Sequence, residues 1–303
     1  MSVFSKLVVA TTHARPVEKM FTGTKPGRAL ARRFVAGDNL DDAVEVAKRL
    51  NAEGFLVSLD LLGEEVFDRD TSLAARDGYQ DCLSRISADG LTSNISVKLT
   101  QLGLNIDTDL AAESIDFLAR EAIAAGTTVT IDMEDSDHTA ATVVLYEKAQ
   151  TSNGNLGLAL QAYLRRTPDD LERLIPLGGH IRLCKGAYVE PPEIALQSRS
   201  EVDAAFAHLT RSLMGSEEVL PAIATHNQAL VDLTRELAAG RKQPFEFQML
   251  YGVRPALQRE LVAARYPLRV YLPFGSQWYP YLTRRLAEPP ANTWFFVRSV
   301  FGS

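Results

Sequence analysis

The sequence has few of the features that define several common classes of protein. Among its 303 residues only Cys82 and Cys184 are cysteines, which is too few for a disulfide framework and is typical of a reducing compartment. No apolar run approaches the length of about 18 residues that a membrane-spanning helix needs. The first ten residues contain an apolar run that is too short for a signal peptide. These absences together predict a cytoplasmic globular protein.

Two signatures of nucleotide binding are also missing. Neither a G-x-G-x-x-G fingerprint nor a P-loop occurs in the sequence, which argues against an open doubly wound sheet that binds a dinucleotide. The formal net charge of -6, from 32 basic and 38 acidic residues, argues against nucleic acid as the main partner. With 46% hydrophobic residues the chain can still bury a large core. This composition indicates a protein that binds a small molecule through local basic patches.

The start of the chain differs from the remainder. Residues 1–37 have a mixed composition and are expected to form a helical arm outside the main domain. The basic run Arg28–Arg33 is usually a solvated helix face, and contact with an anionic membrane surface is the alternative. An amphipathic helix is predicted over Asp38–Glu53 from the spacing of its apolar residues. No linker or low-complexity tract follows, so we expect residues 38–303 to form one domain.

A unit made of a short β-type run, a polar end and a helical segment recurs along the remainder of the chain. The segments between the runs, such as Thr108–Gly126 and Val202–Gly215, are long enough for crossover helices. Eight such units in about 250 residues predict a distorted (β/α)₈ TIM-like barrel with extra N-terminal helices. The eight runs are Phe55–Asp60, Asn94–Leu99, Thr127–Met133, Gly157–Tyr163, His180–Lys185, Leu220–Thr225, Phe245–Leu250 and Leu268–Tyr271.

Polar residues occupy the C-terminal ends of these predicted strands, and in a parallel barrel those ends form the active-site face. Each residue alone has an ordinary explanation: Lys98 can extend to solvent, Asp132 can cap a helix, and His226 can be a core histidine. Their recurrence at nearly every strand predicts a ligand site instead. The residues are Asp60, Lys98, Asp132, Gln161, Tyr163, Arg182, Lys185, Thr225, His226, Gln248 and Tyr271.

One predicted strand carries two cations. The run that begins at His180 contains Arg182 and Lys185 and stops at Gly186. A buried charge costs several kcal/mol unless it is paired, so these cations are expected to face a bound anion. An edge strand with solvated charges is the alternative interpretation.

The last predicted helix carries a second group of cations. Ser276 can cap this helix, on which Tyr281, Arg284, Arg285 and Glu288 share one face. Guanidinium groups bind carboxylates in a bidentate manner, so the adjacent arginines predict a carboxylate clamp. The alternative is an exposed basic stripe in which an arginine pairs with Glu288.

Other kinds of catalytic site receive less support. The acidic cluster that runs from Asp132 to His138 suggests a metal site, but the other histidines lack ligand spacing and the cysteines are far apart. We therefore expect no metal. A G-x-S-x-G nucleophile elbow is absent. Lys98 or Lys185 could form a Schiff base, so a lysine-dependent lyase on the same barrel stays open, as does a non-catalytic ligand-binding barrel.

Several segments together resemble the proline dehydrogenase family, whose flavoenzymes occur alone or as a domain of bifunctional proline-utilisation proteins. The likeness keeps the order of its motifs from about residue 38 to Val300, and the chain has no room for the other parts of a bifunctional protein. A monofunctional member is therefore expected. The matching segments are Asp60–Glu64, Ser96–Lys98, Ile131–Glu134, Arg182–Tyr188, Ala224–Asn227 and Tyr281–Glu288.

The resemblance implies an activity. A member of this family holds FAD without a covalent bond and oxidises L-proline to Δ1-pyrroline-5-carboxylate, by hydride transfer from proline C5 to flavin N5. The electrons pass on to a quinone, which implies a peripheral contact with the inner face of a membrane. This reaction is the first step of proline catabolism to glutamate. The sequence predicts no particular oligomeric state.

The resemblance also implies roles for individual residues. Asp132 and Arg182 would be catalytic, with Arg182 near flavin N5 and Asp132 orienting Lys98 or assisting proton transfer. Glu64, Arg284 and Glu288 would form a gate, in which Glu64 pairs with Arg284 when no substrate is bound. FAD would be held by Met133, Gln161, Arg182, Lys185, Gly186, Ala187, Thr225 and His226. Proline would be bound by Lys98, Arg284 and Arg285 at its carboxylate and by Tyr271, Leu183 and Tyr188 around its ring.

Overall fold

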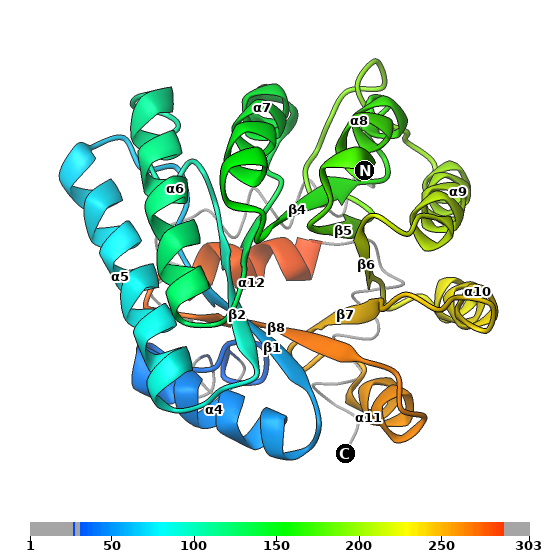
Figure 1. Cartoon of the computed structure of the whole chain (residues 1–303), viewed down its shortest axis with the longest axis horizontal. Helices are drawn as coiled ribbons and strands as arrows, with labels where there is room; N and C mark the ends of the chain where they lie inside the picture. Colours follow the sequence, from blue (N-terminus) through cyan, green and yellow to red (C-terminus); the bar gives the residue numbers. More distant parts are fainter. Residues whose placement is uncertain (1–26, 28–30, 288–303) are drawn as a thin grey trace.

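Eight parallel strands pair in sequence order, and β1 also pairs with β8, so the sheet closes into a barrel (Figure 1). The structure is a computed structural model that describes Gly27 and residues 31–287, with side chains described as far as Thr283. Its closed sheet confirms the predicted (β/α)₈ fold. The strands are β1 Leu56–Leu61, β2 Ser93–Val97, β3 Val129–Ile131, β4 Leu156–Gln161, β5 His180–Cys184, β6 Leu220–Ala224, β7 Glu246–Leu250 and β8 Leu268–Phe274.

Helices surround the barrel, and the predicted helices at Asp38–Glu53, Thr108–Gly126 and Val202–Gly215 are all present. Asn39 caps the first of them by accepting a hydrogen bond from the backbone N–H of Asp42. Within the described residues, no helix has both the length and the apolar character that crossing a membrane requires. The helices are α4 Leu40–Ala52, α5 Arg69–Ala88, α6 Thr108–Ala124, α7 Ser136–Asn153, α8 Thr167–Leu174, α9 Arg199–Gly215, α10 Gln228–Ala238, α11 Pro255–Ala263 and α12 Trp278–Ala287, and the 3₁₀ helix η1 is Ile175–Leu177.

The two faces of the strands differ in chemistry. Successive side chains of a strand point to opposite faces, so one set fills the barrel and the other meets the helices. On β5, for example, Ile181 and Leu183 belong to the main hydrophobic core, whereas His180 and Arg182 bond to polar residues of other strands. A barrel interior is usually filled by branched apolar side chains. Here β1, β2, β3, β5 and β7 each carry buried polar side chains at inward positions.

Several strand boundaries differ from the predicted ones. The third run was expected to extend over Thr127–Met133, but β3 covers only three residues and leaves Asp132 just beyond its end. Lys98 likewise follows β2 directly, whereas Tyr271 lies within β8, which continues for three further residues. The runs at β2 and β3 include loop residues that are buried for packing reasons, so hydrophobicity overestimates the extent of these strands, whereas β8 is longer than its predicted run Leu268–Tyr271.

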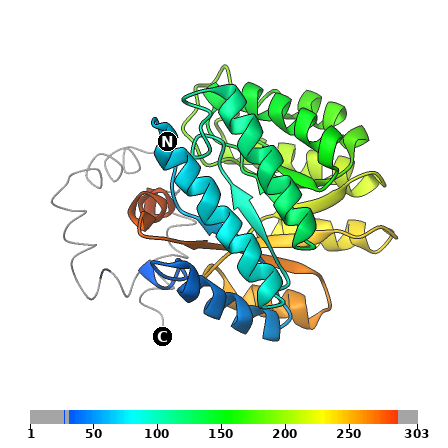
Figure 2. The same ribbon diagram turned by 60° about the vertical axis from the view of Figure 1, so that its left-hand side comes forward.

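The helix α12 lies over the end of the barrel at which the strands finish (Figures 1 and 2). Ser276 was expected to cap it, but the helix begins at Trp278 and Ser276 lies in the preceding turn. Tyr281 of this helix packs in a small hydrophobic cluster with Phe34 and Val35. The described end of the predicted N-terminal arm therefore rests on the barrel, and the boundary at residue 37 stays a prediction.

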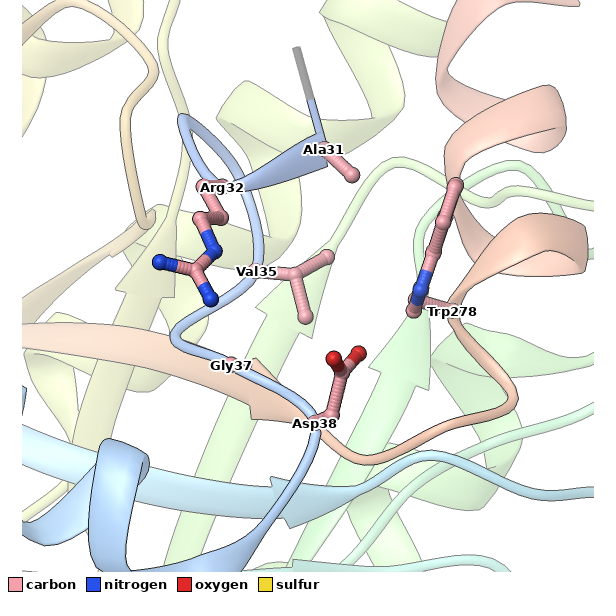
Figure 3. A pocket seen from close by; sticks show the side chains of 6 residues that line it. All are labelled: Ala31, Arg32, Val35, Gly37, Asp38 and Trp278. Carbon is pink, nitrogen blue, oxygen red and sulfur yellow. The ribbon is translucent and has the colours of Figure 1, made fainter. Parts of the chain in front are cut away.

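A pocket opens between this N-terminal segment and α12 (Figure 3). None of its lining residues is a predicted site residue. They are Ala31, Arg32, Val35, Gly37, Asp38 and Trp278.

A buried histidine at the start of β5 makes the stability of the barrel depend on pH. His180 is 9% exposed, and its Nε2 lies 2.6 Å from Oγ1 of Thr130. Burial lowers the pKa of His180 to about 4, and the charges of Arg269 and Arg182 add to this effect while Glu246 opposes it. Because an unfolded histidine titrates near pH 6.5, the unfolded chain binds more protons between pH 6.5 and pH 4.

We therefore predict that the free energy of unfolding falls as the pH drops from 6.5 to 4, with His180 contributing about 3 kcal/mol of that loss. The variant His180→Gln should flatten this part of the profile in denaturant titrations. The variant His208→Gln, at an exposed histidine of α9, serves as the control and should retain the profile of the parent protein. An unchanged slope in His180→Gln would show that this histidine does not titrate as described.

Candidate active site

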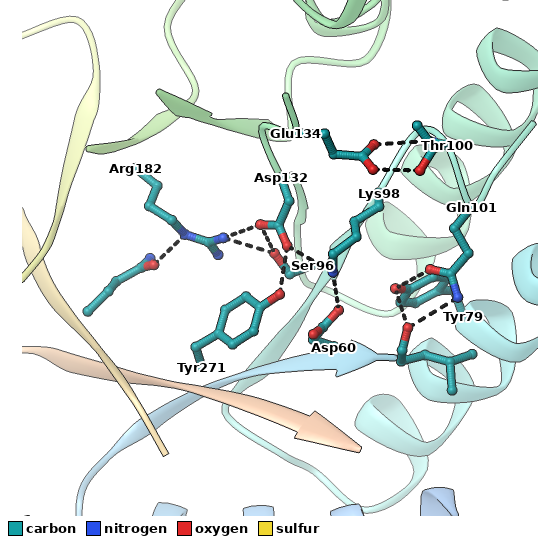
Figure 4. Close-up of polar contacts among 12 residues, drawn as sticks. Asp60, Tyr79, Ser96, Lys98, Thr100, Gln101, Asp132, Glu134, Arg182 and Tyr271 are labelled. Carbon is teal, nitrogen blue, oxygen red and sulfur yellow. Dashed lines mark hydrogen bonds and ion pairs between the residues drawn. The ribbon is translucent and has the colours of Figure 1, made fainter. Parts of the chain in front are cut away.

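A buried carboxylate forms the centre of a polar network at the C-terminal end of the barrel. Asp132, 8% exposed, forms an ion pair with Arg182 through Oδ1. Its Oδ2 accepts a hydrogen bond of 2.7 Å from the hydroxyl of Tyr271 and lies 3.6 Å from Nζ of Lys98. Figure 4 shows these side chains pointing toward one another from the residues that directly follow β2 and β3 and from β5 and β8. Four residues that are distant in the sequence thus meet at one point.

Arg182 is held from several sides. Its Nη1 donates to Oγ of Ser96 at 3.0 Å, and its Nε donates to Oε1 of Gln248 at 2.6 Å. The guanidinium carbon also lies 5.2 Å from the centroid of the Tyr271 ring, within the range of a cation–π contact. Its Nη2 is buried and has no hydrogen-bond partner among the described residues. That nitrogen is therefore available to donate to a ligand.

Lys98 joins the network to β1. Its Nζ donates to Oδ1 of Asp60 at 3.0 Å, and both side chains are buried. Within the described part of the chain, Oδ2 of Asp60 has no hydrogen-bond partner. Two cations, Lys98 and Arg182, therefore lie among two carboxylates, Asp60 and Asp132. A pairing of this kind is what allows four charged groups to be buried together.

The charges of the network set the protonation of its members. Burial raises the pKa of Asp132, but the cations Arg182 and Lys98 outweigh it and hold that pKa below its ordinary value. Burial disfavours the charge on Lys98, yet Asp60 and Asp132 raise the pKa of this amine above its ordinary value. Burial raises the pKa of Asp60, and Asp132 adds to the rise while Lys98 opposes it. Lys98 is therefore an ammonium group at neutral pH, and Asp132 is ionised.

The acidic cluster after β3 separates into different environments. Glu134, 4% exposed, accepts hydrogen bonds from the backbone N–H and the hydroxyl of Thr100 (Figure 4). Asp135 lies 2.6 Å from Nδ1 of His138. In the described residues no group of three or more histidine, cysteine, aspartate or glutamate side chains is arranged to hold a metal ion. These carboxylates instead bond to the β2–α6 loop and to α7.

The loop after β5 is shaped by a glycine. Gly186 has a φ of 126°, and a Cβ at this position would lie 2.3 Å from the ring of Tyr163. The backbone N–H of the next residue, Ala187, donates to Oε1 of Gln161 at 3.2 Å. Nε2 of Gln161 donates to the backbone carbonyl of Glu134 at 2.8 Å, so the loops after β3 and β5 meet at this buried amide at the end of β4. The predicted cofactor residues Gln161, Gly186 and Ala187 are therefore close together.

A second group of predicted cofactor residues surrounds the start of α10. Lys185 forms an ion pair with Asp203 of α9, and Nδ2 of Asn227 donates to the other oxygen of Asp203 at 3.4 Å. Thr225 accepts a hydrogen bond from the backbone N–H of Asn227, and Nε2 of His226 accepts one from the backbone N–H of Leu250. The N-terminus of a helix beside a lysine is an arrangement that suits an anion such as a phosphate group.

The observations above fit a bound dinucleotide such as FAD. An unpartnered guanidinium nitrogen of Arg182 and a lysine beside the start of α10 suit its polar and anionic groups. Lys185 is paired with Asp203 here, so it would exchange that carboxylate for a ligand anion. The site therefore has hydrogen-bond donors both at the centre of the barrel, at Arg182, and at its rim, at Lys185 and the start of α10.

Some predicted site residues lie apart from the network. Leu183 is fully buried in the core, on the face of β5 opposite to Arg182, so it does not border the cluster around Asp132. Met133 is 7% exposed and packs in the same core, while Tyr188 is half-buried. Arg284 and Arg285 belong to α12, but their side chains lie outside the described residues.

The proposed gate is described only in part. Glu64 is half-buried in the loop after β1, and β1 does pair with β8 as expected. Glu288 lies outside the described residues. The partnership of Glu64 with Arg284 therefore stays a prediction.

The sequence assigns no individual role to three residues of the network. Asp60 and Gln248 are predicted only as strand-end residues of the ligand site, and Ser96 only as part of a motif that resembles the family. Ser96 donates to Oδ1 of Asp132 at 2.8 Å and accepts from Arg182. It lies two residues before Lys98, so alternation along β2 could have indicated that both face the barrel interior.

The chain is similar in sequence to known proteins of one family. The sequence model of the family described as proline dehydrogenase matches residues 43–298. Proline dehydrogenase 1 of Bacillus subtilis (strain 168) is 36% identical over 281 residues, which cover 92% of each chain. Proline dehydrogenase of Deinococcus radiodurans is 34% identical over 282 residues, covering 89% of this chain and 90% of that protein.

A solved structure shares the fold. Proline utilization A from Bdellovibrio bacteriovorus, inactivated by N-propargylglycine, aligns with a TM-score of 0.83 at 22% identity, covering 91% of this chain and 34% of that one. The bifunctional protein PutA of Escherichia coli (strain K12) is 28% identical over 323 residues, which span 89% of this chain and only 24% of that protein. Because the family model and the curated relatives match along most of its length, the chain belongs to the proline dehydrogenase family.

Proposed function

We propose that this chain is a monofunctional, FAD-dependent enzyme that oxidises L-proline to Δ1-pyrroline-5-carboxylate, the first step of proline catabolism. One observation carries the proposal: in a chain of this family, Lys98, Asp132, Arg182 and Tyr271 form one buried network at the end of the barrel where active sites occur. When bound, FAD supplies the acceptor for the hydride that leaves proline C5, and its electrons go on to a quinone. The quinone implies peripheral contact with a membrane.

The cofactor would be held by the residues that line the rim. Lys185 and the start of α10, with Thr225 and His226, suit its phosphate groups, and the loop at Gly186 and Ala187 would border the cofactor. Gln161 fixes that loop to the end of β3, next to Met133. Arg182 contributes the unpartnered Nη2.

The substrate would be held through its carboxylate. Lys98 is a buried ammonium group, and together with Arg284 and Arg285 it would form the clamp for that carboxylate. Binding energy from this remote group would position C5 for reaction. Cations around the proline nitrogen favour its neutral form, which hydride loss requires. The rings of Tyr271 and Tyr188 would border the pyrrolidine ring.

Asp132 would act by positioning rather than by covalent chemistry. Its carboxylate contacts Lys98, which would bind the substrate, and Arg182, which would lie near the cofactor. It also contacts Tyr271, whose ring would border the substrate. Asp132 would therefore set the orientation of all three side chains. The same contacts argue against Lys98 as the nucleophile of a Schiff-base lyase, because a nucleophilic lysine must be deprotonated. The raised pKa of Lys98 keeps it charged.

We predict that the purified protein is yellow and that its flavin absorption bleaches when L-proline is added in the absence of oxygen. Because the resemblance to the family implies that FAD is held without a covalent bond, acid or heat should release it unmodified. Anaerobic titration monitored by visible absorption provides the measurement, with D-proline as the control. A colourless protein that borohydride inactivates in the presence of substrate would instead favour the lyase.

The substrate clamp leads to a prediction for α12. Arg284→Met and Arg285→Met should each raise the KM for proline strongly, since leaving a buried carboxylate unpaired costs on the order of 2–5 kcal/mol. FAD occupancy should stay normal in both. The matched control is Arg259→Met, at an exposed arginine of α11. A near-normal KM in both α12 variants would show that these arginines form an ordinary surface stripe.

The predicted pair of Glu64 with Arg284 leads to a prediction about the reaction of the reduced enzyme with dissolved oxygen. An exposed ion pair contributes only about 0–1 kcal/mol, so an incoming carboxylate can compete with Glu64 for Arg284. Glu64→Ala should leave the oxidation of bound proline nearly intact and should raise the rate at which dissolved oxygen reoxidises the reduced enzyme. Stopped-flow measurement of that rate is the test, with Glu113→Ala on the exposed side of α6 as the control. Equal rates in the Glu64 variant and its parent would remove the gate.

A further inference from the structure

Beneath the network of Asp132 lies a second layer of buried charges that the proposed reaction does not use. Nε of Arg269 donates to Oε1 of Glu246 at 2.8 Å, and its Nη2 donates to Oε2 at 3.1 Å. Nη1 of Arg269 also donates to the backbone carbonyl of Val57 at 2.9 Å and lies 3.2 Å from Oδ1 of Asn94. Glu246 is 5% exposed, and although burial opposes its ionisation, Arg269 holds its pKa below the ordinary value.

A single amide joins the two layers. Gln248, 3% exposed, follows Glu246 by two residues on β7, so both side chains face the barrel interior. Its Nε2 donates to Oε1 of Glu246 at 2.6 Å, and its Oε1 accepts from Nε of Arg182 at 2.6 Å. The amide therefore lies between a carboxylate of the lower layer and a guanidinium group of the upper layer.

The chemistry of these neighbours allows only one orientation of the amide. An ionised carboxylate can only accept hydrogen bonds, and a guanidinium group can only donate them. An amide between them satisfies both only with its NH₂ toward Glu246 and its carbonyl toward Arg182. The reversed amide would face a donor with a donor and an acceptor with an acceptor. Because the site is buried, each unpaired group would cost about 1–3 kcal/mol.

The strand between Arg182 and Gln248 carries small side chains, which leave room for the two residues to meet. Arg182 lies on β5 and Gln248 on β7, and the intervening β6 pairs Ala222 with Arg182 and Ala224 with Gln248. Paired residues of neighbouring strands point to the same face of a sheet, so only methyl groups separate the two long side chains. A larger residue at either alanine would occupy the space in which they meet.

We propose that Gln248 is a positioning residue for Arg182 and that Glu246 acts through it by fixing the orientation of its amide. This inference rests on the proposed function, because Arg182 is the residue expected to act on the flavin. Gln248 directs the guanidinium from one side while Asp132 and Ser96 hold it from the other. The plane of the guanidinium group is thereby set before any ligand binds.

The test compares the flavin-loaded parent protein with Gln248→Met, which keeps the size of the side chain and removes its carbonyl and NH₂. We expect kcat to fall by roughly ten- to a hundredfold, as for small displacements of a catalytic group, with KM for proline changed by less than about threefold. The midpoint potential of the flavin should become more negative, because a cation near the reduced cofactor is displaced. Gln150→Met, at a buried glutamine that bonds to Leu156 and Leu177, is the matched control and should change stability only.

A double-mutant cycle tests the role of Glu246. Glu246→Gln replaces an obligatory acceptor with an amide that can also donate, so Gln248 can reverse, and kcat should fall by about two- to tenfold. In the Gln248→Met background the same change should have no further effect on kcat. A persistent effect of Glu246→Gln in that background would show that Glu246 does not act through Gln248.

The outcomes separate this inference from the proposed function. A parent protein without flavin would overturn the proposed function itself. A flavin-loaded Gln248→Met variant with the kcat and potential of the parent would overturn only the positioning role. If Gln248→Met does not fold, Gln248→Asn carries the same expectation, because its amide is one methylene group too short to reach both partners.

Discussion

The ion pair between Asp132 and Arg182 inside the barrel is the interaction on which the remainder of the site depends. Charges removed from water cost several kcal/mol each unless close partners and further hydrogen bonds compensate. Asp132 and Arg182 therefore require Ser96, Lys98, Tyr271 and Gln248 around them, and Lys98 in turn requires Asp60. The polar interior follows from this requirement, since each buried charge needs a neighbour of the opposite sign or a hydrogen-bond partner.

Because the barrel interior is polar, hydrophobic stabilisation of the fold comes from the outer face of the strands. Residues such as Val57, Ile95, Ile181 and Phe247 are fully buried against the helices and form one continuous core. The hydrophobic effect acts on this outer layer, while the inner layer is held by hydrogen bonds and ion pairs. Breaking the inner pairs therefore threatens both function and stability, whereas a change in the outer layer acts on stability alone. Substitutions on the inner and outer faces of one strand are thus expected to have different effects.

The site has a rigid centre and a more accessible rim. At the centre, Arg182 and Lys98 are buried and held by strands or by residues directly after them. At the rim, Lys185 and Asp203 are each about 30% exposed on their side chains and can exchange partners. A cofactor with anionic groups can enter such a rim, because a partly solvated pair costs little to separate. The centre, by contrast, is organised before any ligand arrives, which is what positions reacting groups.

The sequence by itself determined the eight βα units, the active-site end of the barrel and most of the polar residues found there, because strand periodicity, helix spacing and family motifs are local properties. Only the tertiary structure decided which of those residues meet. Asp60, Ser96 and Gln248 received no catalytic role from local patterns, since their significance lies in contacts with residues 38, 86 and 66 positions away along the chain. Alternation along β5 directs the side chain of Leu183 into the core, and its contact with the substrate, which the family motif implies, stays a prediction. The closure of the barrel brings β1 against β8 and β5 near β7, and no short-range pattern contains that information.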